Sequence, residues 1–244
     1  MSEAGEPPAE RGFLSTLAGV YAAPGETFRA VAARPRWEAP LLLAIAIGLA
    51  FTAVWIWKVD PVEFMRAQME ESGGMERIPP ERRADVLQGQ AKWFKAFAWV
   101  GPVFFAPLGL AAMAGVFLFV YRFFYEAELT FAQSLAVVTW CFAAFALLMD
   151  PLILLVMALK NEWSVDPHSV IQASAAALLD KSTTSKPLYA LAGSLDLFSA
   201  WLMALLSIGY GAAIRKPASS AVWAIVALWG AYVMGKVALS AVFQ

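Results

Sequence analysis

The chain has 244 residues, of which 60% are hydrophobic and only 15% are charged, and its mean hydropathy is +0.62. A soluble domain of this size carries ~25% charged residues, so the composition excludes an ordinary soluble globular protein. The formal net charge of −1 gives no basic surplus for binding nucleic acid, and the single cysteine, Cys141, excludes an intrachain disulfide.

The chain begins with acidic residues. Glu3, Glu6 and Glu10 precede the first basic residue, Arg11. A secretory signal would instead begin with positive charge followed by a short apolar core. We therefore expect residues 1–12 to be a retained, flexible acidic tail.

Two short helices are predicted next, over residues 13–21 and 24–33. Pro24 suits the first turn of a helix, and Phe28 and Val31 lie three residues apart on one face. These helices either lie in the membrane interface or form a solvated leader into the first crossing.

Five apolar segments are long enough to cross a bilayer, because a hydrocarbon core of ~30 Å needs ~20 apolar residues of helix. They cover residues 40–57, 97–125, 131–159, 188–214 and 220–243. Lipid offers no hydrogen bonds to a backbone, so each segment should be helical. The predicted fold is all-α: a polytopic membrane protein with a bundle of five transmembrane helices and short interfacial amphipathic helices, over residues 13–243.

The longest polar segment, residues 58–95, separates the first two crossings. It holds seven acidic and seven basic residues. Asp60 followed by Pro61 predicts a helix start, with an end near Glu71, and Pro80 begins a second helix. Balanced charge at helical spacing favours a solvated helical hairpin over a role in gathering a ligand.

A further surface helix is predicted over about residues 167–180, because Asp166-Pro167 repeats the same start and apolar residues follow at helical spacing. His168, the only histidine, lies at the start of this segment. We interpret it as a surface residue, since the sequence places no metal-binding partner near it.

Three charged residues fall inside the apolar segments: Asp150, Asp196 and Lys236. Charge inside a bilayer is costly, and all three lie at a similar depth, roughly 10–14 Å from one face. They form either a ligand or ion site, or structural contacts with Lys236 extending toward the interface. No phosphate-binding loop, metal-spaced histidine pair or catalytic triad is present, so we expect no catalytic residue, cofactor or metal.

Small residues at four-residue spacing predict close helix contacts in two of the crossings. They are Ala111 and Gly115 in the second crossing, and Ala227, Ala231 and Gly235 in the fifth.

The orientation follows from the basic residues beside the crossings. With the N-terminus inside, seven bases lie inside and ten outside, so raw counts favour the opposite orientation. The inner loops are very short, however, and their bases adjoin the crossings. We therefore predict a cytoplasmic N-terminus.

Several motifs resemble the YIP family, the Ypt/Rab-interacting membrane proteins, in its bacterial branch. They are VYAAP at residues 20–24, TF at 27–28, WEAPLLL at 37–43, LDLFSAW at 195–201 and GYG at 209–211. The resemblance implies five spans, a cytosolic N-terminus and a C-terminus on the far side. Eukaryotic members are linked to Rab-type GTPases and vesicle traffic, a role that a bacterium lacking that machinery would not share. Asp196 lies in a matching motif.

The sequence thus predicts a non-enzymatic integral membrane protein of the bacterial plasma membrane that organises membrane or partner proteins. Its expected partners are the lipid bilayer, other membrane proteins or further copies of itself, and not nucleic acid. The alternative is a small transporter or lipid-handling protein with Asp150, Asp196 and Lys236 as its polar core.

Overall fold

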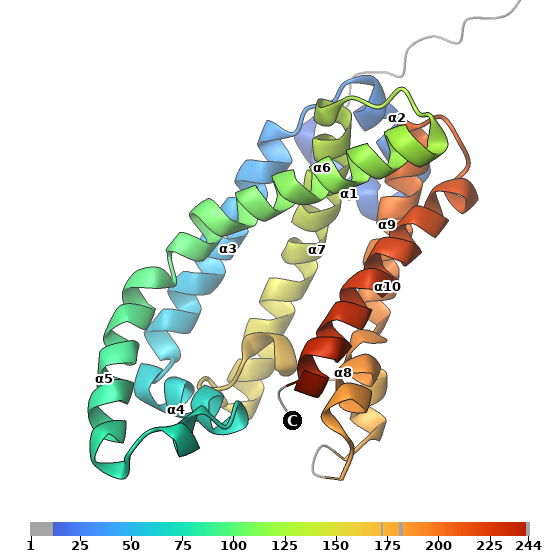
Figure 1. Cartoon of the computed structure of the whole chain (residues 1–244). Coiled ribbons are helices and arrows are strands. Elements are labelled where there is room, and N and C mark those ends of the chain that lie inside the picture. The colour runs from blue at the N-terminus through green and yellow to red at the C-terminus, as the bar shows by residue number, and fades with distance from the viewer. Residues whose placement is uncertain (1–11, 172, 181–182, 243–244) are drawn as a thin grey trace, which may run out of the picture. The chain divides into compact units, whose positions relative to one another are not determined.

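The structure is a computed structural model that describes residues 12–171, 173–180 and 183–242. Helices follow one another from α1 to α10, with short 3-10 and π turns between some of them (Figure 1). No strand occurs in the described residues, which confirms the all-α prediction. The predicted acidic tail, residues 1–12, lies outside the described residues except for Gly12.

The first two helices begin and end close to their predicted limits. They are α1 (Phe13–Ala22) and α2 (Pro24–Ala33), with Pro24 in the first turn of α2. Each buries one face and exposes the other: Val20 of α1 and Phe28 of α2 are fully buried, whereas Leu14 of α1 is 75% exposed and Arg29 of α2 is also exposed.

Four helices in the described part of the chain are long and apolar enough to cross a membrane. They are α3 (Glu38–Lys58), the π turn Gly101–Phe105 with α6 (Ala106–Tyr125), α7 (Phe131–Lys160) and α10 (Ala218–Val242). The π turn contains Pro102, which has no amide hydrogen to continue the regular helical pattern.

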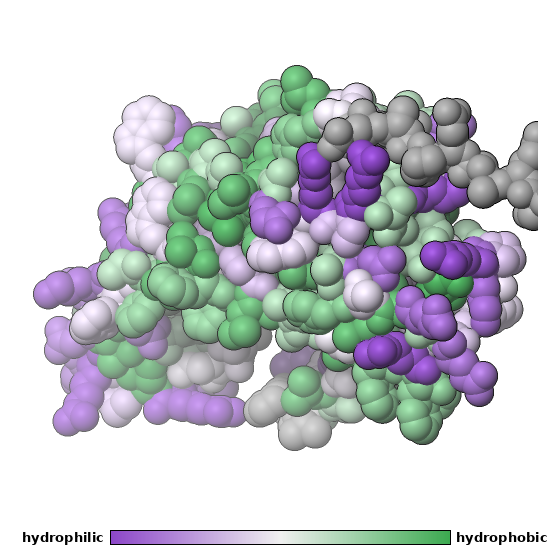
Figure 2. Space-filling view, turned by 90° about the horizontal axis from the view of Figure 1, so that it is seen from above, coloured by the Kyte–Doolittle hydropathy of each residue, from purple (hydrophilic) through white to green (hydrophobic). Residues whose placement is uncertain are grey.

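The surface of the molecule agrees with a lipid environment. Large apolar side chains point outward along the spans, including Phe104, Phe119 and Met234, each more than 60% exposed. Broad apolar areas are visible on the face shown in Figure 2, with charged side chains in separate clusters. An exposed apolar surface of this kind is costly in water and favourable in hydrocarbon.

The fourth predicted crossing is not a single helix. Where the sequence predicted one helix over residues 188–214, the structure has α8 (Lys186–Ser194) and α9 (Leu197–Ala213). The interruption falls at Leu195 and Asp196, because an aspartate bonds the amides of the residues that follow it and so begins a new helix.

The surface helix predicted over residues 167–180 is also absent from the described residues of that segment. Two 3-10 turns, Pro167–Ser169 and Ala175–Leu178, occupy this segment instead. The intervening backbone pairs with the α8–α9 break: the Ala175 amide donates to the Leu195 carbonyl at 3.0 Å, and a bridge joins Ser174 to Asp196. This pairing requires extended backbone and excludes a helix there.

The polar segment forms the predicted helical hairpin. Its helices are α4 (Pro61–Glu71) and α5 (Pro80–Phe97), joined through a 3-10 turn, Gly74–Arg77. The Asp60 carboxylate caps α4 as predicted, accepting hydrogen bonds from the Val62 and Glu63 amides at 2.8 and 3.1 Å.

The chain divides into two compact units. The first comprises the described residues of Met1–Leu42, Leu110–Phe145 and Gln172–Gln244, and the second comprises Leu43–Gly109 and Ala146–Ile171. In the second unit, the aromatic rings of Trp55, Phe64 and Phe94 join α3, α4 and α5, with centroids 5.1–5.4 Å apart.

The first unit holds the larger core. Its buried side chains come from α1, α2, α6, α7, α9 and α10. Helix α10 runs along α9 and reaches α8, while α2 packs on α9 (Figure 1). The two helices that precede the first crossing are therefore built into the core of this unit.

Candidate functional site

The three predicted polar residues lie on three different elements. Asp150 is half-buried in α7, directly before Pro151, and belongs to the second unit. Asp196 lies between α8 and α9, and Lys236 is exposed on α10, both in the first unit.

The Asp196 carboxylate is occupied by the start of α9. One oxygen accepts from the Ser199 amide at 2.8 Å, and the other accepts from the Ser199 hydroxyl at 2.5 Å. This is the geometry of a helix N-cap, in which a negative charge also lies at the positive end of the helix dipole.

No ion pair joins Asp196 to Lys236 within the described residues. A lysine on the outer face of a span can extend its chain toward the headgroups, where the ammonium group stays hydrated. The grouping of Asp150, Asp196 and Lys236 into one polar site stays a prediction.

A buried hydroxyl cluster in the first unit was not predicted. The Ser134 hydroxyl lies 2.7 Å from the Ala114 carbonyl and 2.7 Å from the Tyr210 hydroxyl. Beside it, the Tyr121 hydroxyl donates to the Ala221 carbonyl at 2.7 Å. The cluster links α6, α7, α9 and α10 through groups that lipid could not satisfy.

The sequence contained a signal for this cluster. A buried tyrosine needs a partner for its hydroxyl, and Tyr121 and Tyr210 both lie in strongly apolar segments. Both groups are neutral, so the charged residues of the spans gave no indication of them.

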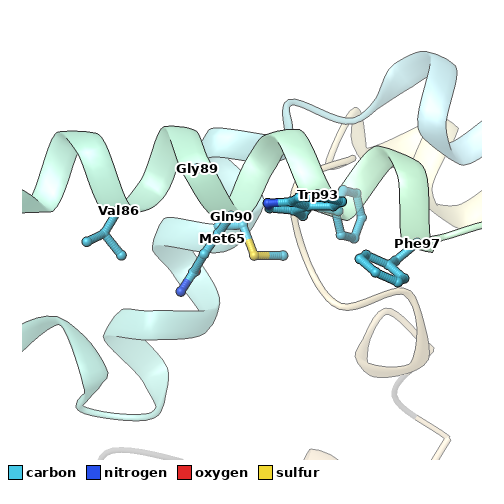
Figure 3. A pocket seen from close by; sticks show the side chains of 7 residues that line it. Met65, Val86, Gly89, Gln90, Trp93 and Phe97 are labelled. Carbon is cyan, nitrogen blue, oxygen red and sulfur yellow. The ribbon is translucent and has the colours of Figure 1, made fainter.

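The second unit carries an apolar groove along its hairpin, with a volume of about 490 Å³. Met65 of α4 lies near Gln90 and Trp93 of α5, and Val86 and Phe97 line the groove farther along α5 in either direction (Figure 3). Trp93 is 64% exposed within the charged segment, and Phe97, the last residue of α5, is 60% exposed. Aromatic side chains next to a span are typical of the headgroup region.

Comparison with known families identifies the family to which the chain belongs. The Yip1 domain matches residues 18–239, which is most of the chain. The chain belongs to the Yip1 domain family. Searches of curated proteins and of solved structures each found no match.

The match confirms the family resemblance seen in the motifs. It begins within α1 and ends within α10, so the second half of α1 and all of α2 are part of the Yip1 domain. The LDLFSAW motif covers the break before α9: its aspartate is the cap and its serine is Ser199, the partner of that cap. The chain is therefore an integral membrane protein of the YIP family.

Proposed function

We propose that this protein is a non-enzymatic scaffold of the bacterial plasma membrane. It organises other membrane proteins around a rigid platform, which is the helix pair α1 and α2. In this proposal the N-terminus is cytoplasmic. The helices α8 and α9 together form the fourth of five crossings, since α9 alone is nearly the ~20 residues that a bilayer needs.

The observation that carries the proposal is the attachment of α1 and α2 to the core. Phe28 is fully buried and lies against Gly209, where an added Cβ would meet its ring at 3.2 Å. The Tyr21 hydroxyl donates to the Ala144 carbonyl at 2.6 Å, and the Gln133 amide donates to the Ala32 carbonyl at 3.0 Å. A mobile leader would not need these contacts.

The outer face of this pair mixes apolar and charged side chains. Leu14 on α1 and Arg29 on α2 are exposed, while the inner faces hold them in fixed positions. A surface fixed in advance loses little conformational entropy when a partner binds. This supports recognition of a protein partner at the membrane interface.

The transporter alternative needs a polar core in which Asp196 is free to bind cargo. The use of both Asp196 oxygens by Ser199 favours a structural role for this residue. A transporter would lose flux on replacement of Asp150, Asp196 or Lys236 while keeping its stability.

Site-specific photocrosslinking in cells tests the proposal. A photoreactive residue at Leu14 should give protein adducts, identified by mass spectrometry. One at Met234, 74% exposed on a span, should give mainly lipid adducts. A Phe28→Ala change should detach the platform and reduce the Leu14 adducts. Equal adducts at both positions, or flux into liposomes that depends on Asp150, would overturn it.

A further inference from the structure

A polar pocket of about 390 Å³ lies where α6 and α9 end. Its walls are the α6–α7 loop, the α9–α10 loop and the first turn of α7. The charged residues lining it are Glu126, Glu128, Arg215 and Lys216. A volume of this size is within the range of small-molecule binding sites.

The charges in this pocket do not neutralise one another. Glu126, Glu128 and Arg215 are exposed, and none of them forms an ion pair with another described residue. Lys216 donates to the Tyr125 carbonyl at 3.3 Å, with its ammonium group 5.7 Å from the Tyr125 ring centre. Two carboxylates and two cations thus surround one space without pairing across it.

Two of these residues hold a backbone conformation that favours glycine. Glu126 has φ +51° and Arg215 has φ +55°. At Arg215 the helix ends in a Schellman turn, with the Lys216 amide donating to the Gly211 carbonyl at 2.9 Å. Glycine would relieve this strain but would remove a charge from the pocket.

The ends of two candidate spans would place the pocket at the level of lipid headgroups. The span Gly101–Tyr125 ends at its rim, and the span Ala218–Ala241 begins two residues after Lys216. A ligand in this position would therefore have access from the bilayer surface.

We infer that the pocket binds the headgroup of a zwitterionic phospholipid carrying a primary ammonium group, such as phosphatidylethanolamine. Arg215 and Lys216 bind the phosphate, and Glu126 and Glu128 accept hydrogen bonds from the ammonium group. A choline headgroup cannot donate those hydrogen bonds, and a glycerol headgroup carries no positive charge. The inference is independent of the scaffold role proposed above.

Native mass spectrometry of the detergent-purified protein tests this assignment. Phosphatidylethanolamine, phosphatidylglycerol and phosphatidylcholine of matched chain length are added separately. We expect the ethanolamine lipid to bind most tightly, and Arg215→Gly or Glu128→Gln to weaken it at least about tenfold, since each removes a charge-assisted contact. Arg215→Gly should at the same time raise Tm, which separates lost binding from lost folding.

Asn161→Gly is the matched control. Asn161 has φ +53° after α7 but does not line the pocket, so this change should leave lipid binding unaltered. Equal binding of all three lipids, or an ethanolamine preference unchanged in both pocket variants, would overturn the inference. Soluble phosphoethanolamine that binds as tightly as the lipid would overturn the bilayer as the source of the ligand.

Discussion

Gly209 is a point of close approach between α9 and its neighbours α2 and α7. A Cβ there would lie 2.6 Å from Val137 Cγ1 and 3.2 Å from the Phe28 ring. Only hydrogen fits, so α2, α7 and α9 can pack at this distance. In a membrane, where hydrocarbon also surrounds the unfolded helices, such close packing is a main source of association energy.

We predict that Gly209→Ala destabilises the protein by about 1–3 kcal/mol, the usual range for overpacking a core. The apparent Tm in detergent reports the change. It is measured from the fluorescence of a dye that labels the Cys141 thiol when unfolding exposes it. Cys141 is fully buried in the same unit and is the only thiol available to label.

Gly235→Ala is the control for this prediction. A Cβ at Gly235 meets no atom within 4 Å, so alanine should be neutral or slightly stabilising in a helix. A similar loss of Tm in both variants would mean that close packing at Gly209 is not the cause.

Ser134 gives a second prediction at this scale. Its hydroxyl serves both the Ala114 carbonyl and the Tyr210 hydroxyl. Ser134→Ala should cost about 1–2 kcal/mol, because it leaves buried polar groups unpaired. Ser207→Ala should cost much less, since the Ser207 hydroxyl bonds only the Met203 carbonyl of its own helix. Thermal melting of the two variants that gave equal losses would contradict the cluster's role.

The glycines show that the sequence alone could not predict which of them make close helix contacts. Spacing predicted close contacts at Gly115 and Gly235, but both meet open space in the described residues. Gly209 belongs to the GYG motif, but its partners come from α2 and α7, which are distant in sequence, so the motif could not show what it contacts. Spacing along a helix shows which small residues share one face, but it does not show what packs against that face.

The interruption between α8 and α9 is the main feature at the level of elements. The backbone at the interruption bonds to the extended segment around Ser174, and the Asp196 side chain caps the new helix. Breaks of this kind in apolar segments are tolerated when other parts of the protein satisfy the backbone.

We predict that Asp196→Ala lowers the unfolding free energy by about 1 kcal/mol, as expected for loss of an N-cap. Asp196→Asn should cost less, because one oxygen still accepts from the Ser199 amide. Asp60→Ala provides the matched change at the cap of α4. The two Asp196 variants would be compared by thermal melting and by liposome flux; normal melting with lost flux would reject a structural role.

The elements that were predicted well are those with local signals. Proline and capping residues fixed the starts of α2 and α4, and both helices begin where those residues stand. Helix α8 and the 3-10 turns near Ser174 were missed because their conformation depends on pairing between residues about twenty positions apart. Asp196 is a typical N-cap residue, but the apolar residues on both sides of it led to the prediction of one continuous crossing.

For the whole molecule, the number of crossings decides which loops share a side. If α8 and α9 together cross the bilayer, the hairpin and the α9–α10 loop lie on opposite sides. If they do not cross, the two loops lie on the same side. The five-crossing topology therefore makes a prediction that holds for either orientation of the N-terminus.

Single-cysteine labelling measures this directly. Glu76 in the hairpin and Ser219 at the start of α10 are both exposed, whereas Cys141 is buried and should not react in the folded protein. With a membrane-impermeant maleimide on intact cells, we expect Glu76→Cys to react at once and Ser219→Cys to react only after lysis. Reversed accessibility would keep five crossings but invert the orientation. Equal labelling of both positions on intact cells would show that α8 and α9 do not cross, and would put the α9–α10 loop on the outer side with the hairpin.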